Sequence, residues 1–227
     1  MSLNRCAAVV TAAITLATFN ACMRLPGQPS PSARPERPSE VTNFDQLFAE
    51  NCAGCHGADG HFGGALPLNN QAYLALVDDA SMRNAIANGI IGTSMPAFAV
   101  SSGGMLTDDQ ITAIVNGVRS KWGAESRPIE GAPPYLSSKF GDAAQGAQLF
   151  GDYCASCHGA DGTGGKAGAI TNPSFLTLYN DQTLRTLIIA GRPDLGHPGW
   201  RDYPDKPALD SAQVSDIVAW LAAKRGS

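Results

Sequence analysis

Sulfur and imidazole side chains recur in this chain at one spacing, Cys-x-x-Cys-His, which occurs twice. The residues are Cys52, Cys55 and His56 in the first copy and Cys154, Cys157 and His158 in the second. At the end of a helix, two thiols three positions apart can reach the two vinyl groups of one porphyrin. The adjacent imidazole then lies beneath the iron. This spacing is typical of covalent haem c attachment.

Two other kinds of site use paired cysteines. A redox-active dithiol does not need the histidine and would not follow this repeat. A zinc site could use both pairs, but exported proteins rarely bind zinc in this way, and the pairs lie in separate repeats. Haem attachment is therefore the favoured interpretation of both motifs.

The two motifs belong to a tandem repeat. Residues 46–48 match residues 148–150, and the offset of 102 positions continues through the motif and beyond it. The later matches include Leu74/Leu176, Asp79/Asp181, Arg83/Arg185, Ile86/Ile188, Gly89/Gly191 and Pro96/Pro198. A match of this length indicates duplication of one domain of roughly 85 residues.

A Pro-rich segment separates the two copies. Residues 120–141 contain three prolines and show no amphipathic period. We therefore expect a first domain over 41–122, a linker over 123–140 and a second domain over 141–227. These two domains are called the first and second repeat below.

Each repeat is expected to hold three helices. The first runs into the Cys motif and presents one apolar face, formed by Phe44, Leu47 and Phe48 in one repeat and by Ala147, Leu149 and Phe150 in the other. The second covers residues 79–88 and 181–190. The third begins after Thr107 and after Asp210, each with a glutamine three positions later that completes a capping box. A Gly- and Asn-rich loop is expected between the motif and the second helix.

With these motifs, each half resembles a class I cytochrome c domain, and the whole resembles a tandem dihaem cytochrome c over about residues 41–225. The resemblance implies an all-α fold in which three main helices wrap around each of two covalently attached haem c groups. It also implies that a backbone carbonyl near Pro67 accepts the proton of the proximal imidazole. The second repeat has Ala169 at the matching position, so that inference is weaker there.

The expected sixth iron ligands differ between the repeats. Met95 lies 39 residues after His56 and is followed by proline, which matches the Met-Pro loop of the family. The second repeat has no methionine, and His197 occupies the matching position, 39 residues after His158. A thioether ligand raises the reduction potential, whereas an imidazole stabilises ferric iron. The alternatives are Met95 as core filler, Met105 as the ligand, and an open or water-bound second iron.

Two arginines and one further histidine are also candidates. Arg83 and Arg185 occupy the same place in the repeat, on a helix expected to face the haem, where a guanidinium would pair with a propionate. The alternative is a solvated helix face. His61 lies only five residues after His56, so we expect an exposed loop residue that cannot reach the distal side.

The N-terminus resembles an export signal. Residues 1–22 contain Arg5 followed by an apolar Ala- and Thr-rich run, and Cys22 follows a small residue as in a lipoprotein cleavage box. A lipid on Cys22 is favoured over an uncleaved anchor helix and over plain secretion. Residues 23–40 are Pro- and Ser-rich and are expected to form an extended tether. The folded part would then lie on the periplasmic side of a membrane.

The composition narrows the function classes. A net charge of −4 and 16 % charged residues argue against a nucleic-acid partner. The favoured function is a membrane-tethered carrier of single electrons between redox partner proteins, in a respiratory or photosynthetic chain or as a subunit of a larger complex. The alternative is a dihaem enzyme that acts on a sulfur oxyanion or a peroxide at the second haem. A redox or gas sensor is a third, weaker alternative.

Overall fold

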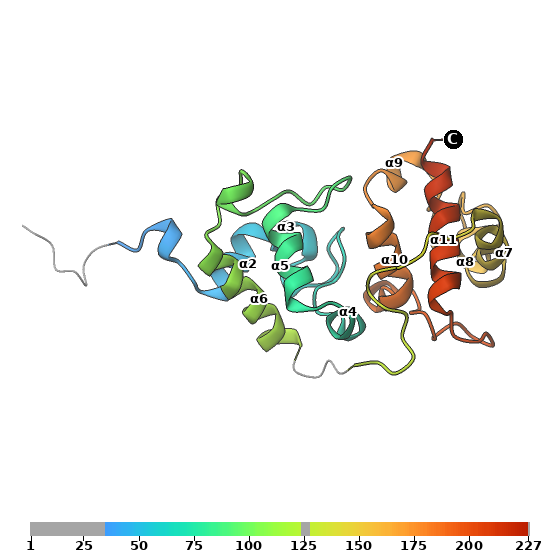
Figure 1. Cartoon of the computed structure of the whole chain (residues 1–227), viewed down its shortest axis with the longest axis horizontal. Coiled ribbons are helices and arrows are strands. Elements are labelled where there is room, and N and C mark those ends of the chain that lie inside the picture. Colours follow the sequence, from blue (N-terminus) through green and yellow to red (C-terminus); the bar gives the residue numbers. More distant parts are fainter. Residues whose placement is uncertain (1–34, 124–127, 227) are drawn as a thin grey trace, which may run out of the picture. The chain divides into compact units, whose positions relative to one another are not determined.

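The computed structural model describes residues 35–123 and 128–226 (Figure 1). The predicted signal segment, Cys22 and most of the predicted tether lie outside the described residues. Within the described ranges the regular structure is helical, with two isolated β-bridges and no strands, which confirms the all-α class. No helix in this part of the chain is long and apolar enough to cross a membrane. Residues 39–227 form one compact unit that contains both repeats.

The first repeat follows a short 3-10 helix, η2 (Pro38–Glu40). Its helices are α2 (Phe44–Asn51), α3 (Ala53–His56), α4 (Gln71–Leu76), α5 (Asp79–Asn88), η3 (Val100–Ser102) and α6 (Asp108–Trp122). The second repeat contains α7 (Ala143–Tyr153), α8 (Ala155–His158), α9 (Pro173–Leu176), α10 (Asp181–Ala190), η4 (Pro193–Leu195), α11 (Ser211–Ala223) and η5 (Lys224–Gly226).

The predicted helices are present, and their ends have the expected caps. The second helices, α5 and α10, have the predicted bounds. Both capping boxes form, at Thr107 before α6 and at Asp210 before α11. The segment expected as loop after each Cys motif instead contains a short helix. Asn70 caps α4 and Asn172 caps α9 through side-chain oxygens that accept backbone N–H groups.

The helix before each motif packs on the last helix of its repeat, as α7 does on α11 (Figure 1). In the first repeat Phe44 fits over Gly117, where a Cβ atom would lie 2.0 Å from the Phe44 ring. In the second repeat Gly146 stands at the Phe44 position, and its Cβ would lie 2.9 Å from Cβ of Trp220. The large and small partners are thus exchanged between the two repeats.

That exchange corrects one detail of the predicted apolar face. Ala147 is exposed, whereas Gly146 beside it is buried against α11. The helices approach so closely at this position that only a residue without a side chain fits there. Phe150, by contrast, is buried and lies 4.2 Å from the Trp220 ring, just as Phe48 lies 5.0 Å from the Trp122 ring.

Each repeat has its own apolar core. Buried aliphatic residues of the last helix contribute to both cores, with Ile111 and Ile114 in the first and Val214 and Ile217 in the second. The described part of the predicted linker packs against them, since Tyr135 contacts the first core and Ile129 the second.

Candidate haem sites

Each Cys motif lies where two helices meet. Cys52 ends α2 and begins α3, and Cys154 does the same between α7 and α8. The short helix ends at Gly57 or Gly159, whose φ angles of 83° and 82° lie in the left-handed region. A Cβ atom at Gly57 would lie 1.8 Å from the His61 carbonyl oxygen, so glycine is required there. The chain therefore reverses directly after the motif histidine.

The reversal brings a carbonyl to each motif histidine. Nδ1 of His56 lies 2.7 Å from the Leu66 carbonyl oxygen, and Nδ1 of His158 lies 3.1 Å from that of Gly168. The first bond is the one expected before Pro67, and the second shows that Ala169 does not prevent it. When Nδ1 donates to a carbonyl, Nε2 keeps the lone pair that a metal needs.

Burial favours the neutral forms of Cys52, His56 and Cys154. It lowers the pKa of His56, and the Arg192 guanidinium adds to this, whereas the bond to Leu66 opposes it. Burial raises the pKa of Cys52 to about 11 and that of Cys154 to about 12. The four motif cysteines are free of disulfides. Among residues 35–123 and 128–226, no three His, Cys, Asp or Glu side chains gather as a multidentate metal site would require.

Met95 lies in a tight loop after α5. The Ile90 N–H donates to the Met95 carbonyl oxygen over 3.1 Å, and the side chain of Met95 is half-buried against the first core. The alternative ligand Met105 is 83 % exposed, and the remaining methionine of this repeat, Met82, is buried in the core at 3 % exposure.

His197 lies in the matching loop of the second repeat and faces the motif histidine. The ring centroids of His158 and His197 are 6.1 Å apart, with an interplanar angle of 49°. Nδ1 of His197 is buried and has no hydrogen-bond partner among the residues that the structure describes. Burial, together with His158 and Arg192, lowers the pKa of His197, while a contact with the Pro198 carbonyl opposes this. A neutral imidazole is the form that binds metal.

Two family models match the chain over most of its described length. The model of cytochrome c oxidase, cbb3-type, subunit III matches residues 39–116, and the model of cytochrome c matches residues 143–224. The chain belongs to the tandem dihaem cytochromes c. A cytochrome c domain implies covalently bound haem c, for which the Cys-x-x-Cys-His motif of each repeat supplies the thiols.

The chain spans 44% to 59% of the length of two relatives that it matches. It is 32% identical over 191 residues to the cbb3-type cytochrome c oxidase subunit FixP of Sinorhizobium medicae, covering 79% of this chain and 59% of that protein. It is 31% identical over 153 residues to subunit CcoP of Cereibacter sphaeroides, covering 59% of this chain and 44% of that protein. Among solved structures, a chain of the Kuenenia stuttgartiensis reducing HAO-like protein complex has a TM-score of 0.44 and 18% identity, covering 84% of this chain and 99% of that one.

The second repeat of this cytochrome fits a haem iron between its two imidazoles. Two imidazoles that each bind one metal through a ring nitrogen hold their ring centroids about 6 Å apart, since each metal–nitrogen bond is about 2 Å. The observed distance of 6.1 Å between the ring centroids of His158 and His197 agrees with this separation.

Arg83 and Arg185 both make hydrogen bonds within the protein. The Arg83 guanidinium hydrogen-bonds to the Thr112 hydroxyl on α6. Arg185 is 2 % exposed. Its donors reach the Pro134 carbonyl at 2.9 Å and the Ser211 hydroxyl at 3.0 Å. Both arginines therefore bond to the last helix of their own repeat, and Arg185 also bonds to the linker, while their pairing with a propionate stays a prediction.

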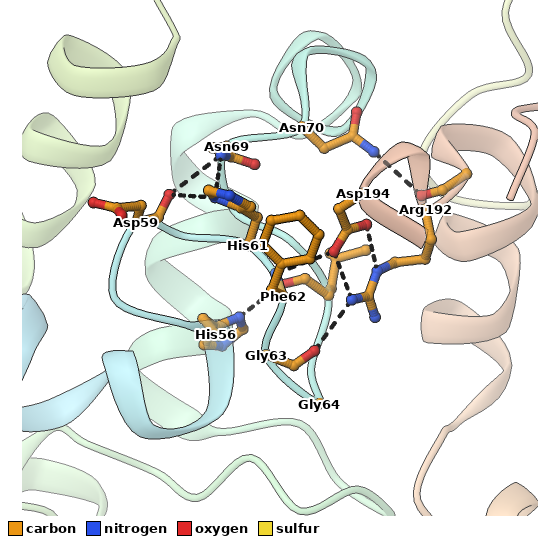
Figure 2. A network of polar contacts seen from close by, with 12 residues as sticks. His56, Asp59, His61, Phe62, Gly63, Gly64, Asn69, Asn70, Arg192 and Asp194 are labelled. Carbon is orange, nitrogen blue, oxygen red and sulfur yellow. Dashed lines mark hydrogen bonds and ion pairs between the residues drawn. The ribbon is translucent and has the colours of Figure 1, made fainter. Parts of the chain in front are cut away.

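His61 is a loop residue, as predicted, but it is half-buried. Its Nδ1 lies 2.9 Å from Nδ2 of Asn69, and its ring lies 4.3 Å from that of Phe62 (Figure 2). Sequence reasoning missed a neighbouring group of polar residues, Asn70, Arg192 and Asp194, which joins the two repeats. No local pattern marks this group, because its partners lie more than 100 residues apart in the chain.

Proposed function

We propose that the chain binds two haem c groups, one in each repeat. Cys52 and Cys55 attach the first haem, with His56 and Met95 as its axial ligands. Cys154, Cys157, His158 and His197 serve the second haem in the same way. The facing imidazoles of His158 and His197, 6.1 Å apart, are the observation that carries this proposal.

The two ligand sets give the haems different potentials. Met/His ligation raises the potential of a haem, while a second imidazole stabilises the ferric state. The first haem is then the high-potential centre and the second the low-potential one. Electrons flow favourably from the second repeat to the first. Six-coordinate iron in both repeats suits electron transfer, because no position is left open for a substrate.

In the cell, the chain carries electrons within a respiratory membrane complex. The support is its similarity to proteins named as subunits of cbb3-type cytochrome c oxidases, of which FixP is covered over 59%. The domains span 41–122 and 141–227, joined by the linker 123–140. A lipid on Cys22 or an N-terminal anchor helix holds them at the periplasmic face, where redox partner proteins dock.

Electron transfer to an oxidase is the direct test. The dithionite-reduced holoprotein, freed of excess reductant, is mixed with a purified cbb3-type oxidase under air, and haem oxidation is followed at the α-band. Oxidation that depends on oxidase concentration supports the proposal. Reduction or oxidation of the holoprotein by thiosulfate, sulfite or peroxide, with turnover and without any partner, would instead favour the enzyme. Mass spectrometry of membrane-purified protein tests the lipid on Cys22.

A further inference from the structure

An ion pair in the ligand loop of the second repeat contacts the first repeat (Figure 2). Nε and Nη2 of Arg192 donate to the two carboxylate oxygens of Asp194 at 2.9 and 2.8 Å. The two side chains are only 12% and 6% exposed. The bidentate geometry fixes both groups relative to each other. We refer to this pair as the Arg192–Asp194 clamp.

The clamp forms hydrogen bonds to the loop that follows the first Cys motif. Nη2 of Arg192 donates to the Gly63 carbonyl at 3.1 Å, and Oδ2 of Asp194 accepts from the Phe62 N–H at 3.1 Å. These two residues lie on the same loop as Leu66, whose carbonyl orients the ring of His56. The clamp therefore holds the proximal side of the first site.

The backbone of the same arginine holds the distal side of the second site. The Arg192 N–H donates to the His197 carbonyl at 3.1 Å, and the His197 N–H donates to the Arg192 carbonyl at 2.9 Å. The four residues between them, which include the helix η4, form a closed loop on this bridge. Arg192 thus contacts the second site through its backbone and the first through its side chain.

Asn70 reinforces this junction. Besides capping α4, its Nδ2 donates to the carbonyls of Ala190 and Gly191 at 3.0 and 3.2 Å, directly before Arg192. Asn70 is 5 % exposed. Asn172 has the same position in the second repeat, caps α9 and is exposed. The buried arrangement is thus particular to the first copy and serves the contact between the repeats.

The backbone of Phe62 is held in an uncommon conformation at the point of contact. Its φ angle is 59°, in the left-handed region that non-glycine residues seldom adopt. The matching residue of the second repeat is Gly164. Such a conformation persists only where its surroundings enforce it. The bond from the Phe62 N–H to Asp194 is one such constraint.

We propose that Arg192 and Asp194 are positioning residues that couple the two haem sites, because they fasten the proximal loop of the first to the distal-ligand loop of the second. This inference rests on the proposed function, in which His56 and His197 are axial ligands. Release of the clamp loosens both loops together. Removal of either partner leaves an uncompensated charge in a nearly closed position, so the remaining group moves toward water and its contacts are lost.

The test compares three variants of the holoprotein. Arg192→Gln removes both the charge and the two-bond contact with the Asp194 carboxylate. Arg192→Lys keeps the charge but cannot make both bonds. Arg201→Gln is the control and removes a charge from an exposed residue of the same segment. One readout is the rate at which imidazole binds the ferric second haem. The other is hydrogen exchange of the amides of residues 57–66. We expect both rates to rise about 10-fold in Arg192→Gln, about the effect of one lost charge-assisted hydrogen bond.

Arg192→Lys should show a smaller rise than Arg192→Gln, because it keeps a charge opposite Asp194 but cannot make both bonds to the carboxylate, and Arg201→Gln should behave like the parent protein. Faster imidazole binding with unchanged hydrogen exchange of residues 57–66 overturns the coupling. The clamp would then stabilise only the loop of the second repeat. Unchanged values in both readouts overturn it as well. Should Arg192→Gln fail to fold, Asp194→Asn removes the same ion pair with almost no change in shape and has the same expected results.

The two proposals fail in different ways. If His197 is not a ligand, His197→Met leaves the spectrum of the second haem unchanged, and the ligand proposal fails. The exchange of residues 57–66 still reports on the clamp in that case, since it does not depend on any haem ligand. If the clamp variants have no effect but His197→Met changes the spectrum of the second haem, only the coupling is overturned.

Discussion

The loops over residues 89–98 and 191–200 carry different proposed iron ligands on a similar backbone. Both begin at a glycine that ends a helix, with φ angles of 69° at Gly89 and 68° at Gly191. A Cβ at either glycine would lie 2.7 to 2.8 Å from backbone atoms on the far side of its loop. At the same register the first loop presents Met95 and the second His197. The backbone of the loop sets the position of the proposed ligand, and the side chain at that position sets its chemistry.

The loops differ in a second respect. The first loop closes through its own backbone and a turn at Thr93. The second contains the Arg192–Asp194 clamp and reaches across to the first repeat. Both loops thus contact the other repeat, but in different ways: the first loop accepts a bond at the Ile91 carbonyl from Nδ2 of Asn180 at 3.3 Å, whereas the second loop holds a largely buried ion pair against the first repeat. Four predictions test this comparison.

The largest effect is expected from removing one haem at a time. Replacing Cys52 and Cys55 by Ala should unfold the first repeat and leave the second haem bound, and replacing Cys154 and Cys157 should do the reverse. A repeat this small buries too little apolar surface by itself, so the haem supplies much of its core. Circular dichroism melting and a pyridine haemochrome assay measure the result. A cooperative, native-like melt of the altered repeat would contradict the prediction.

The exchanged helix pairs should give the next largest effect. Gly146→Phe places a ring where a Cβ already lies 2.0 Å from the Asp216 carbonyl oxygen, so α7 and α11 must separate. Overpacking of this kind costs about 1–3 kcal/mol of unfolding free energy. Denaturant unfolding of the holoprotein measures the loss.

Trp220→Gly in the same chain would recreate the Phe44 and Gly117 pairing of the first repeat. The double variant should therefore recover part of the stability lost in Gly146→Phe. A double variant less stable than the sum of the two single losses would show that the repeats do not share this packing geometry.

A smaller effect is expected from a pair of arginines. Arg119 donates to the Leu74 carbonyl at 2.5 Å and pairs with Asp79 at 2.7 Å. Arg225 donates to the Tyr179 carbonyl at 2.8 Å and pairs with Asp181 at 2.5 Å.

Arg119→Gln and Arg225→Gln should each cost about 1–2 kcal/mol, because half-buried carbonyls lose their donor. Each variant should lower the melting temperature of its own repeat alone. Lys121→Gln is the matched control, since the Lys121 side chain and its partner Asp45 are largely exposed at 43% and 73%. A loss in the control as large as in the arginine variants would contradict the assignment.

Features that are local in the chain could be predicted from the sequence. The Cys motifs, the helices from 79 and 181, and the capping boxes at Thr107 and Asp210 depend on neighbouring residues, so spacing alone located them. The positions of Met95 and His197 followed from the repeat register. The carbonyl partner of His56 followed from the family resemblance, and its counterpart at Gly168 has the same geometry.

The remaining features depend on partners far away in the chain. Arg83 and Arg185 share a helix position, but their hydrogen bonds to Thr112 on α6 and Ser211 on α11 did not follow from it. The replacement of Phe44 in the first repeat by Gly146 in the second is explained only by the packing of these residues against α6 and α11. Arg119 and Arg225 make equivalent contacts although they are 106 positions apart, outside the 102-residue register.

The central claim is that the repeats hold haems with different axial ligands, and an optical redox titration of the holoprotein tests it most directly. The account predicts two separate one-electron waves, with the lower wave assigned to the second haem. In His197→Met the lower wave should shift up toward the higher one, and in Met95→His the higher wave should shift down. A single high-potential wave in the parent protein, or a lower wave unmoved by His197→Met, would contradict the account.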